Sequence, residues 1–280
     1  MRLRGIISLC LGAVFLTGCN TMPPEPAPSL TPVAAERSPK AKPSPSEAAV
    51  SVAGATTVGH NPPVVSHGSR ERQVVALTFD ADMTEVMLKN TSASFVNVKI
   101  LDMLQERQIP ATFFITGLWA KRYPEHTRRI AAENRFEIAN HTYKHSAYTP
   151  NCYSLPQLPR TELTSDAAKT FEVLSEFGGN QTRYFRFPGL CHDTAALTAL
   201  APLGVTVVDG DVISGDPFAT ASRPIVDAVL SQVKAGSIII LHVTEANAQY
   251  TDEALGPILE GLAKKGLTPV KLSDLLSRRG

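Results

Sequence analysis

The chain has 280 residues, of which 43% are hydrophobic, and its formal net charge is +1 at pH 7. A chain of this length can bury one substantial core, so we expect a single folded domain with additional segments rather than two full domains. The balanced charge argues against the broad basic surface typical of nucleic-acid-binding proteins, and we therefore predict no nucleic-acid partner.

Residues 1–18 have the pattern of a bacterial signal peptide. A short basic region precedes an apolar run over 6–16, which is too short to span a bilayer comfortably. The segment leads into the letters LTGC at 16–19, which resemble the lipobox of bacterial lipoproteins. This resemblance implies that Cys19 carries lipid and anchors the protein to a membrane, while an ordinary secretory signal with an incidental cysteine is the alternative. The signal peptide predicts secretion across the inner membrane. By resemblance to Gram-negative lipoproteins, Asn20 after Cys19 favours an outer-membrane anchor facing the periplasm if the organism is Gram-negative.

Residues 19–70 are rich in Pro, Ala, Ser and Thr and show no sustained apolar period. We predict a disordered tether there and a folded domain over 71–280. Such a tether would let the domain reach from a membrane toward a polymeric substrate, although a spacer without that role fits equally well.

Two of the four cysteines remain for the folded domain. Cys10 falls in the signal peptide and Cys19 in the lipobox, which leaves Cys152 and Cys191 as an even pair in an oxidising compartment. A disulfide between them is the expectation, with two unpaired buried thiols as one alternative. A thiolate metal site is the other, and it lacks a closely spaced Cys or His partner for Cys152.

From residue 72 onward, short β-branched and aromatic runs alternate with longer segments of helical spacing. The strands are predicted at 74–79, 111–115, 136–139, 184–187, 205–208, 237–241 and 268–271. Between the first two strands, apolar residues recur at spacings of three and four, which predicts a helix with one apolar face; they are Val96, Ile100, Leu101 and Leu104. The alternation favours an α/β fold, a distorted (β/α)7 barrel of parallel strands. An open doubly wound sheet is the alternative, but the turn at 80–82 lacks the glycine-rich phosphate loop typical of that fold.

Polar side chains collect where these predicted strands end. In parallel barrels the strand C-termini converge on one face, so residues far apart in the sequence can meet there. The residues in question are Asp80, Asp82, His141, His145, Arg186, Asp211, Asp216 and His242. We therefore expect one shared site.

The strongest local element is the pair His141 and His145. Imidazoles four residues apart on one helical turn project to the same side and can bind one Zn²⁺-like ion. Such a pair alone is more often surface decoration, but carboxylates at another strand end favour the ligand interpretation. Two histidines and one aspartate leave coordination positions open for water and substrate, as catalytic sites require.

Five short motifs occur in a characteristic order: LTFD at 77–80, HTYKH at 141–145, RFPG at 186–189, the stretch 211–216, and LH at 241–242. They resemble those of the polysaccharide deacetylases of carbohydrate esterase family four, also called the NodB homology domain. The resemblance covers roughly residues 73–271. It implies a NodB-like barrel and a catalytic domain over 71–280.

The resemblance also implies roles for individual residues. Asp80 would be the general base, with Arg186 as the partner that orients it and holds it ionised. His242 would protonate the departing amine, with Asp216 keeping that imidazole charged and oriented.

The metal site departs from the family pattern. The family usually has two adjacent aspartates after Phe79, the second being a metal ligand, whereas this chain has Ala81 there and Asp82 one residue later. Either Asp82 reaches the ion through a changed turn, or His141 and His145 hold it alone with weaker occupancy. We expect the first, with Zn as the ion and Co, Ni or Mn as alternatives.

We therefore expect a metal-dependent hydrolase that removes acetyl groups from N-acetylated amino sugars of a cell-envelope polysaccharide. Peptidoglycan is favoured, because an anchored envelope protein meets it first. The alternatives are an O-acetyl esterase on the same scaffold and an inactive carbohydrate-binding lipoprotein. The expected partners are an acetylated glycan and a membrane, and the expected state is a monomer. Trp119 fits core packing better than a sugar platform, and His192 fits a solvated loop better than a substrate contact.

Overall fold

The computed structural model describes residues 60–277. The predicted signal peptide at 1–18, the lipid attachment at Cys19 and most of the predicted tether lie outside these residues. No helix within 60–277 combines the length and the apolar character that crossing a membrane requires.

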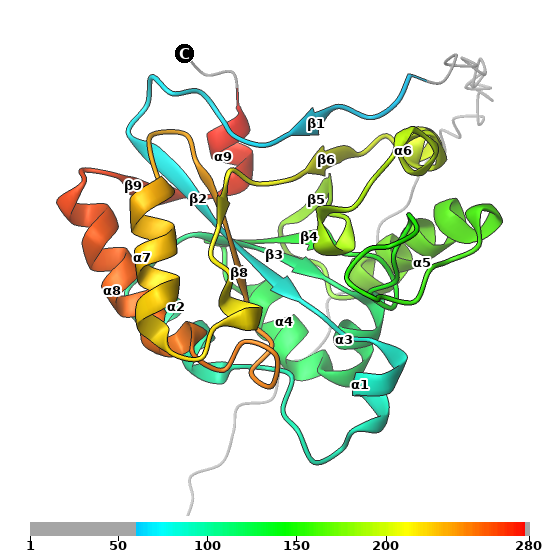
Figure 1. Cartoon of the computed structure of the whole chain (residues 1–280), viewed down its shortest axis with the longest axis horizontal. Helices are drawn as coiled ribbons and strands as arrows, with labels where there is room; N and C mark the ends of the chain where they lie inside the picture. The colour runs from blue at the N-terminus through cyan, green and yellow to red at the C-terminus, as the bar shows by residue number, and fades with distance from the viewer. Residues whose placement is uncertain (1–59, 278–280) are drawn as a thin grey trace, which may run out of the picture. The chain divides into compact units, whose positions relative to one another are not determined.

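The described residues form a parallel sheet with helices around it (Figure 1). The strands are β1 (Val64–Val65), β2 (Val74–Ala81), β3 (Ala111–Ile115), β4 (Phe136–Asn140), β5 (Gln181–Phe185), β6 (Thr206–Val208), β7 (Val212–Ile213), β8 (Ile238–His242) and β9 (Thr268–Val270). The α-helices are α1 (Glu85–Lys89), α2 (Val98–Glu106), α3 (Gly117–Arg122), α4 (Pro124–Ala132), α5 (Leu163–Ser175), α6 (Thr194–Leu200), α7 (Ser222–Gln232), α8 (Thr251–Lys264) and α9 (Leu272–Leu276). Short 3₁₀ helices are η1 (Arg160–Glu162), η2 (Pro188–Leu190), η3 (Ala201–Leu203) and η4 (Asp216–Phe218).

The strand order is β1-β6-β5-β4-β3-β2-β8-β7, and β9 pairs with β2. Every strand pair is parallel. Among the described strands no pairing joins β1 to β7, so the sheet is a curled half-barrel with two open edges. The predicted α/β fold of parallel strands is confirmed, and the open edges are the distortion of the barrel.

The central strand β2 explains why the sheet forms where it does. Its sequence VVALTFDA is buried at every position after Val74, because β3, β8 and β9 flank it and helices cover its faces. A continuous apolar run is typical of such a strand. Helices α2, α7 and α8 pack together on one flank and α3, α4 and α5 on another (Figure 1). The predicted stripe of α2 is buried at Ile100, Leu101 and Leu104.

The structure differs from the predicted elements at three places. Strands β1 and β7 have two residues each, which is too short for a period to show in a sequence. Strand β5 begins at Gln181, three residues before the predicted 184. Its first residues are polar and partly exposed, so they lack the apolar pattern from which the strand was predicted. Residues 60–70, predicted as the end of the tether, belong to the fold, since Val64–Val65 pair with β6.

Candidate active site

Strand β2 and the residue that follows it place two carboxylates, those of Asp80 and Asp82, on one face of the sheet. Side chains alternate along a strand, so Asp80 and Asp82 point the same way while Ala81 points into the hydrophobic core. The carbonyl oxygen of Ala81 accepts hydrogen bonds from the backbone N–H and the hydroxyl of Thr116, at 3.2 and 2.9 Å. These bonds fix the end of β2, and both carboxylates are nearly buried there.

The segment 141–145 follows β4 as a loop. The prediction that His141 and His145 share one helical turn is wrong, because Thr142 and His145 have φ angles of 69° and 55°, which no α-helix accommodates. The two imidazoles face the same region because the loop folds back on itself, with ring centroids 5.0 Å apart.

Buried partners hold this loop on both sides. The side chain of Asn140 accepts the N–H of Thr142, and the carboxylate of Asp166 in α5 accepts the N–H of Tyr143, both at 2.9 Å. The carbonyls of the same two loop residues accept the N–H groups of Gly117 and Leu118 at the start of α3. A buried loop requires such complete pairing, since each unmet backbone group costs free energy.

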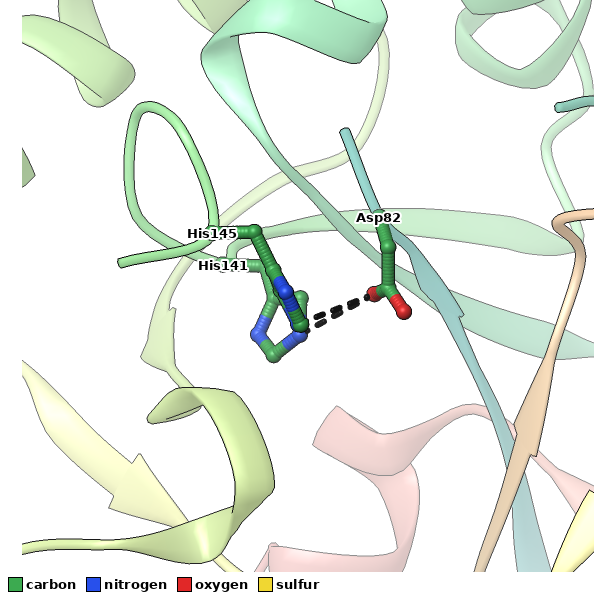
Figure 2. Close-up of side chains that lie close together, drawn as sticks. All are labelled: Asp82, His141 and His145. Atoms are coloured by element: carbon green, nitrogen blue, oxygen red, sulfur yellow. Dashed lines mark ion pairs between the residues drawn. The ribbon is translucent and has the colours of Figure 1, made fainter. Parts of the chain in front are cut away.

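Asp82, His141 and His145 form a compact donor group (Figure 2). The Nε2 atom of each imidazole lies 3.4 Å from Oδ1 of Asp82, and one donor atom from each residue lies within 4.8 Å of the others. Oδ1 of Asp82 is buried and has no hydrogen-bond partner. An unpartnered carboxylate oxygen facing two imidazole nitrogens is the arrangement that a divalent cation satisfies.

The protonation of the two histidines fits the same interpretation. Nδ1 of His141 lies 2.9 Å from the carbonyl oxygen of Arg186, which can only accept, so Nδ1 carries a hydrogen and Nε2 is the ring nitrogen that faces Asp82. Burial lowers the pKa of His145 to about 4, which leaves that imidazole neutral at pH 7. Each imidazole therefore turns Nε2 toward Asp82, and the donor set fits a divalent cation.

Asp80 is paired with a fully buried arginine. Nη1 of Arg186 lies 2.6 Å from Oδ1 of Asp80. The guanidinium also donates to the carbonyls of Val208 and Asp209 at 3.1 and 3.2 Å, and it stacks on the ring of Phe114 at 3.9 Å. Every side of the arginine is thus fixed, and it holds the Asp80 carboxylate in one orientation.

His242 ends β8 opposite the carboxylates and is held by Asp216. Nδ1 of His242 lies 2.8 Å from Oδ1 of Asp216, and its backbone N–H donates to Oδ2 at 2.7 Å. The hydroxyls of Ser214 and Thr251 each donate to Asp216 at 2.7 Å. Burial lowers the pKa of His242, but the charges of Asp216 and Asp82 outweigh it and raise the pKa to about 10, so the imidazole is protonated at pH 7.

These groups line one cavity of about 380 Å³. Its lining includes Asp80, Asp82, His141, His145, Asp216 and His242, together with Tyr153, Gly189, Ile213 and Phe218. This volume is within the range of small-molecule pockets, and an acid, a base and a cation site in one apolar cavity are able to cleave a polar bond.

One predicted member of the site lies elsewhere. Asp211 accepts from Arg70 at 2.6 Å, from the hydroxyl of Ser237 at 3.1 Å and from the N–H of Ile238 at 2.9 Å. The prediction that it lines the site is wrong. Strand β7 runs parallel to β8 and places Asp211 at the start of β8, away from the C-terminal end where His242 lies.

A disulfide joins Cys152 to Cys191, with Cα atoms 6.0 Å apart. It links the loop after β4 to the segment after η2, on one wall of the cavity. Gly189 in that wall has a φ of 60°, and a Cβ atom there would lie 2.6 Å from the ring of Tyr153 and 2.9 Å from Sγ of Cys152. The glycine of the RFPG motif thus leaves room for the disulfide and for Tyr153.

Trp119 and His192, which the sequence analysis weighed as substrate contacts, are not among the residues that line this cavity. Trp119 is buried in the core and donates its ring N–H to the carbonyl of Phe95 at 2.7 Å. His192 lies 3.2 Å from the carboxylate of Asp209. Residues that the sequence patterns missed include Tyr153, Ser214, Phe218 and Thr251, since none stands at the end of a predicted strand.

The chain is similar in sequence to known proteins. The sequence profile of the family described as "Polysaccharide deacetylase" matches residues 67–208, which is just over half of the chain. A peptidoglycan-N-acetylglucosamine deacetylase of Bacillus cereus is 30% identical over 209 residues, which cover 74% of this chain and 70% of the relative. A bifunctional xylanase/deacetylase of Pseudobutyrivibrio xylanivorans is 26% identical over 76% of this chain, and the match spans 32% of that relative's length.

Solved structures agree on the fold. A peptidoglycan N-acetylglucosamine deacetylase has a TM-score of 0.64 at 27% identity, with 76% of this chain and 92% of the other covered. An acetyl xylan esterase of Clostridium thermocellum, solved with a cobalt ion, has a TM-score of 0.57 at 26% identity, covering 72% and 89%. A pseudoenzyme of carbohydrate esterase family four from Bacillus anthracis has a TM-score of 0.64 at 21% identity, covering 78% and 70%, and supports the fold alone.

The profile match, the relative in B. cereus, the half-barrel and the Asp-His-His group agree. The chain belongs to the polysaccharide deacetylase family of hydrolases.

Proposed function

We propose that this protein is a metal-dependent deacetylase that removes acetyl groups from N-acetylated amino sugars of a cell-envelope polysaccharide, with peptidoglycan as the substrate and zinc as the ion. One observation carries the proposal. The buried, unpartnered Oδ1 of Asp82 faces the imidazoles of His141 and His145 in the cavity that also holds a paired carboxylate and a protonated histidine.

The proposed chemistry divides among one set of three residues and two pairs. When bound by Asp82, His141 and His145, a divalent ion supplies Lewis-acid polarisation of a carbonyl group and eases deprotonation of a water molecule. Asp80, oriented by Arg186, accepts the proton of the water whose oxygen adds to the acetyl carbon.

The second proton transfer completes the reaction. As the carbon–nitrogen bond breaks, the leaving nitrogen takes the proton that His242 carries on Nε2, and free acetate and an amine result. Asp216 accepts from Nδ1 of His242, so Nε2 faces the cavity and the charge on the ring is compensated. An amine leaves poorly without such a proton, whereas an alcohol needs it less, so the His242–Asp216 pair favours an amide over an ester substrate.

The choice of peptidoglycan as substrate rests on the expected location of the protein in the cell envelope. We propose that Cys19 is lipid-anchored in the cell envelope and that the protein acts there as a monomer. The B. cereus relative bears the name of a peptidoglycan-N-acetylglucosamine deacetylase, which supports the same substrate class.

The test combines metal content with acetate release. The purified chain is stripped with chelator, supplied with Zn, Co, Ni or Mn, and assayed on peptidoglycan, on N-acetylglucosamine oligomers and on O-acetylated xylan. We expect about one ion per chain and acetate from the first two substrates. Asp82→Ala is expected to lose both ion and acetate release.

Asp227→Ala is the matched control, because Asp227 is 59% exposed and pairs with Arg223 on the surface of α7. It is expected to behave as the wild type. Release of acetate only from xylan would replace the proposal with an esterase. A chain that binds glycan without ion or acetate release would replace it with a binding protein.

A further inference from the structure

Exposed apolar side chains gather at the mouth of the cavity. Among the described residues the exposed large hydrophobic side chains are Val64, Val86, Val98, Tyr153, Ile213 and Phe218. Half of them line the cavity: Tyr153 is 69% exposed, Ile213 46% and Phe218 77%. Single exposed apolar residues are ordinary, but a group of them around a polar site marks a surface that a ligand covers.

Tyr153 and Phe218 form a stacked pair, which we name the aromatic rim. Their ring centroids are 6.2 Å apart and their planes differ by 28°. The two rings come from different segments, the loop after β4 and the end of η4. They are the two most exposed large hydrophobic residues of the cavity lining, whereas Asp82 and His141 are nearly buried.

The backbone around the rim is built to hold these rings. Asn151, Tyr153 and Ser154 all have positive φ angles, 58°, 47° and 59°. Such angles are uncommon for residues other than glycine and persist only where surrounding contacts impose them. Cys152 lies between these residues, and its disulfide to Cys191 supplies a covalent constraint.

Phe218, the other half of the rim, is held close to Asp216, the partner of the proposed acid His242. Phe218 donates its N–H to the carbonyl of Gly215 at 3.0 Å. It stands two residues after Asp216, whose carboxylate is held by His242 and two hydroxyls. The rim therefore keeps a fixed position relative to the reacting groups.

We propose that the aromatic rim stacks on the apolar face of a sugar ring adjacent to the ring that carries the acetyl group. This inference rests on the proposed function. A cavity of about 380 Å³ has room for about one sugar unit, so the rest of a polymer has to lie at the mouth. A pyranose ring presents a flat face of C–H groups, and an aromatic ring covers such a face while the sugar hydroxyls stay in water.

The rim thus acts as a sugar-binding subsite that makes the affinity for substrate depend on chain length. It adds affinity for an oligosaccharide and none for a single sugar, since a single sugar has no neighbouring ring to place there. This distinction separates the rim from the walls of the acetyl pocket, which contact both kinds of substrate.

The test uses Tyr153→Ala and Phe218→Ala with N-acetylglucosamine and its tetramer as substrates. Each variant is expected to raise KM for the tetramer about tenfold, the loss expected when roughly 60 Å² of apolar surface is no longer buried, with kcat nearly unchanged. KM for the monomer is expected to stay the same. Tyr153→Phe keeps the ring and is expected to keep wild-type KM, and Val86→Ala is the control because Val86 is 76% exposed and lies outside the cavity lining.

A second measurement separates the rim from the proposed chemistry. Tetramer affinity is measured by calorimetry in chains that carry Asp80→Asn, with and without the rim substitutions. Weaker tetramer binding in the rim variants supports the subsite even if the wild type releases no acetate. Equal changes for monomer and tetramer, unchanged affinity in both rim variants, or no tetramer binding with the rim intact would each overturn it. A melting temperature within a few degrees of the wild-type value shows that a variant is folded. If Tyr153→Ala does not fold, the test rests on Phe218→Ala alone.

Discussion

Arg186→Met removes the buried cation that pairs with Asp80 and leaves an aliphatic side chain of similar length. Arg186 is fully buried, and Asp80 is only 6% exposed, so solvent cannot replace the lost partner. A buried ion pair broken on one side costs about 3–5 kcal/mol, chiefly because the remaining charge is uncompensated. The native stability of a domain is about 5–15 kcal/mol, so the variant is expected to fold and to unfold at much lower denaturant.

A double-mutant cycle isolates the pair. Asp80→Asn together with Arg186→Met removes both charges, and we expect the double variant to be more stable than Arg186→Met alone by about 2 kcal/mol. The matched surface cycle uses Arg223 and Asp227, which are 81% and 59% exposed and four residues apart on α7. That cycle is expected to give a coupling of at most about 0.5 kcal/mol.

The assay is urea unfolding followed by circular dichroism, with chelator present so that every variant is metal-free. The reasoning fails if Arg186→Met costs no more than Arg223→Met. It also fails if Asp80→Asn adds further destabilisation to Arg186→Met, because the unpaired carboxylate would then not be the source of the cost.

The remaining predictions concern the acid, the disulfide, the displaced aspartate and the anchor. His242→Ala is expected to lower kcat by about 10²–10⁴ while metal content stays near one ion per chain, and an unchanged kcat would remove it as the acid. Reduction of Cys152–Cys191, which are 39 residues apart, is expected to cost about 4 kcal/mol of stability without releasing the ion, as followed by melting and metal analysis. Exchanging Ala81→Asp with Asp82→Ala is expected to abolish metal binding, and calorimetry showing wild-type affinity would refute the argument from strand alternation. Cys19→Ser is expected to move the protein from the membrane to the soluble fraction of cells, and retention in the membrane would refute the anchor.

The proximity of Asp80 and His242 was predictable from the sequence, because both residues stand at the C-terminal ends of parallel strands. The run that forms β2 is apolar from Val74 to Phe79 except for Thr78, so the change to aspartates after Phe79 is evident in the sequence. Parallel pairing of β2 with β8 places Asp80 in register with His242, although the two are far apart along the chain. The rule that parallel strands end on one face therefore predicted that the proposed base and the proposed acid lie together.

Local geometry was less predictable. The four-residue spacing of His141 and His145 suggested a helical turn, but buried partners of the loop impose positive φ angles that a sequence period does not reveal. Strand β7 is too short to show a period, and its position next to β8 decides that Asp211 binds Arg70 instead of lining the site. Tertiary contacts override the local pattern in both cases.

The aromatic rim had no sequence signal. Tyr153 stands in a loop and Phe218 ends the three-residue helix η4, so neither belongs to a segment long enough to show a helical or strand period. The disulfide of Cys152 constrains the segment that carries Tyr153, and the hydrogen bond from Phe218 to Gly215 closes the turn that carries Phe218. The two rings meet because these segments lie side by side in the fold. Features of this kind are visible only once the surface is assembled.

The aspartate at 82 shows how a departure from the family motif can preserve its chemistry. Strand β2 continues through Ala81, which pairs with Ile115 of β3, so the alternation of side chains holds to the end of the strand. A carboxylate at 81 would point into the hydrophobic core, where burying a charge is costly. The next position on the face of Asp80 is Asp82, and it is there that the unpartnered oxygen meets the two imidazoles. Because side chains alternate here, an aspartate at 82 rather than at 81 supplies the carboxylate that faces the two imidazoles.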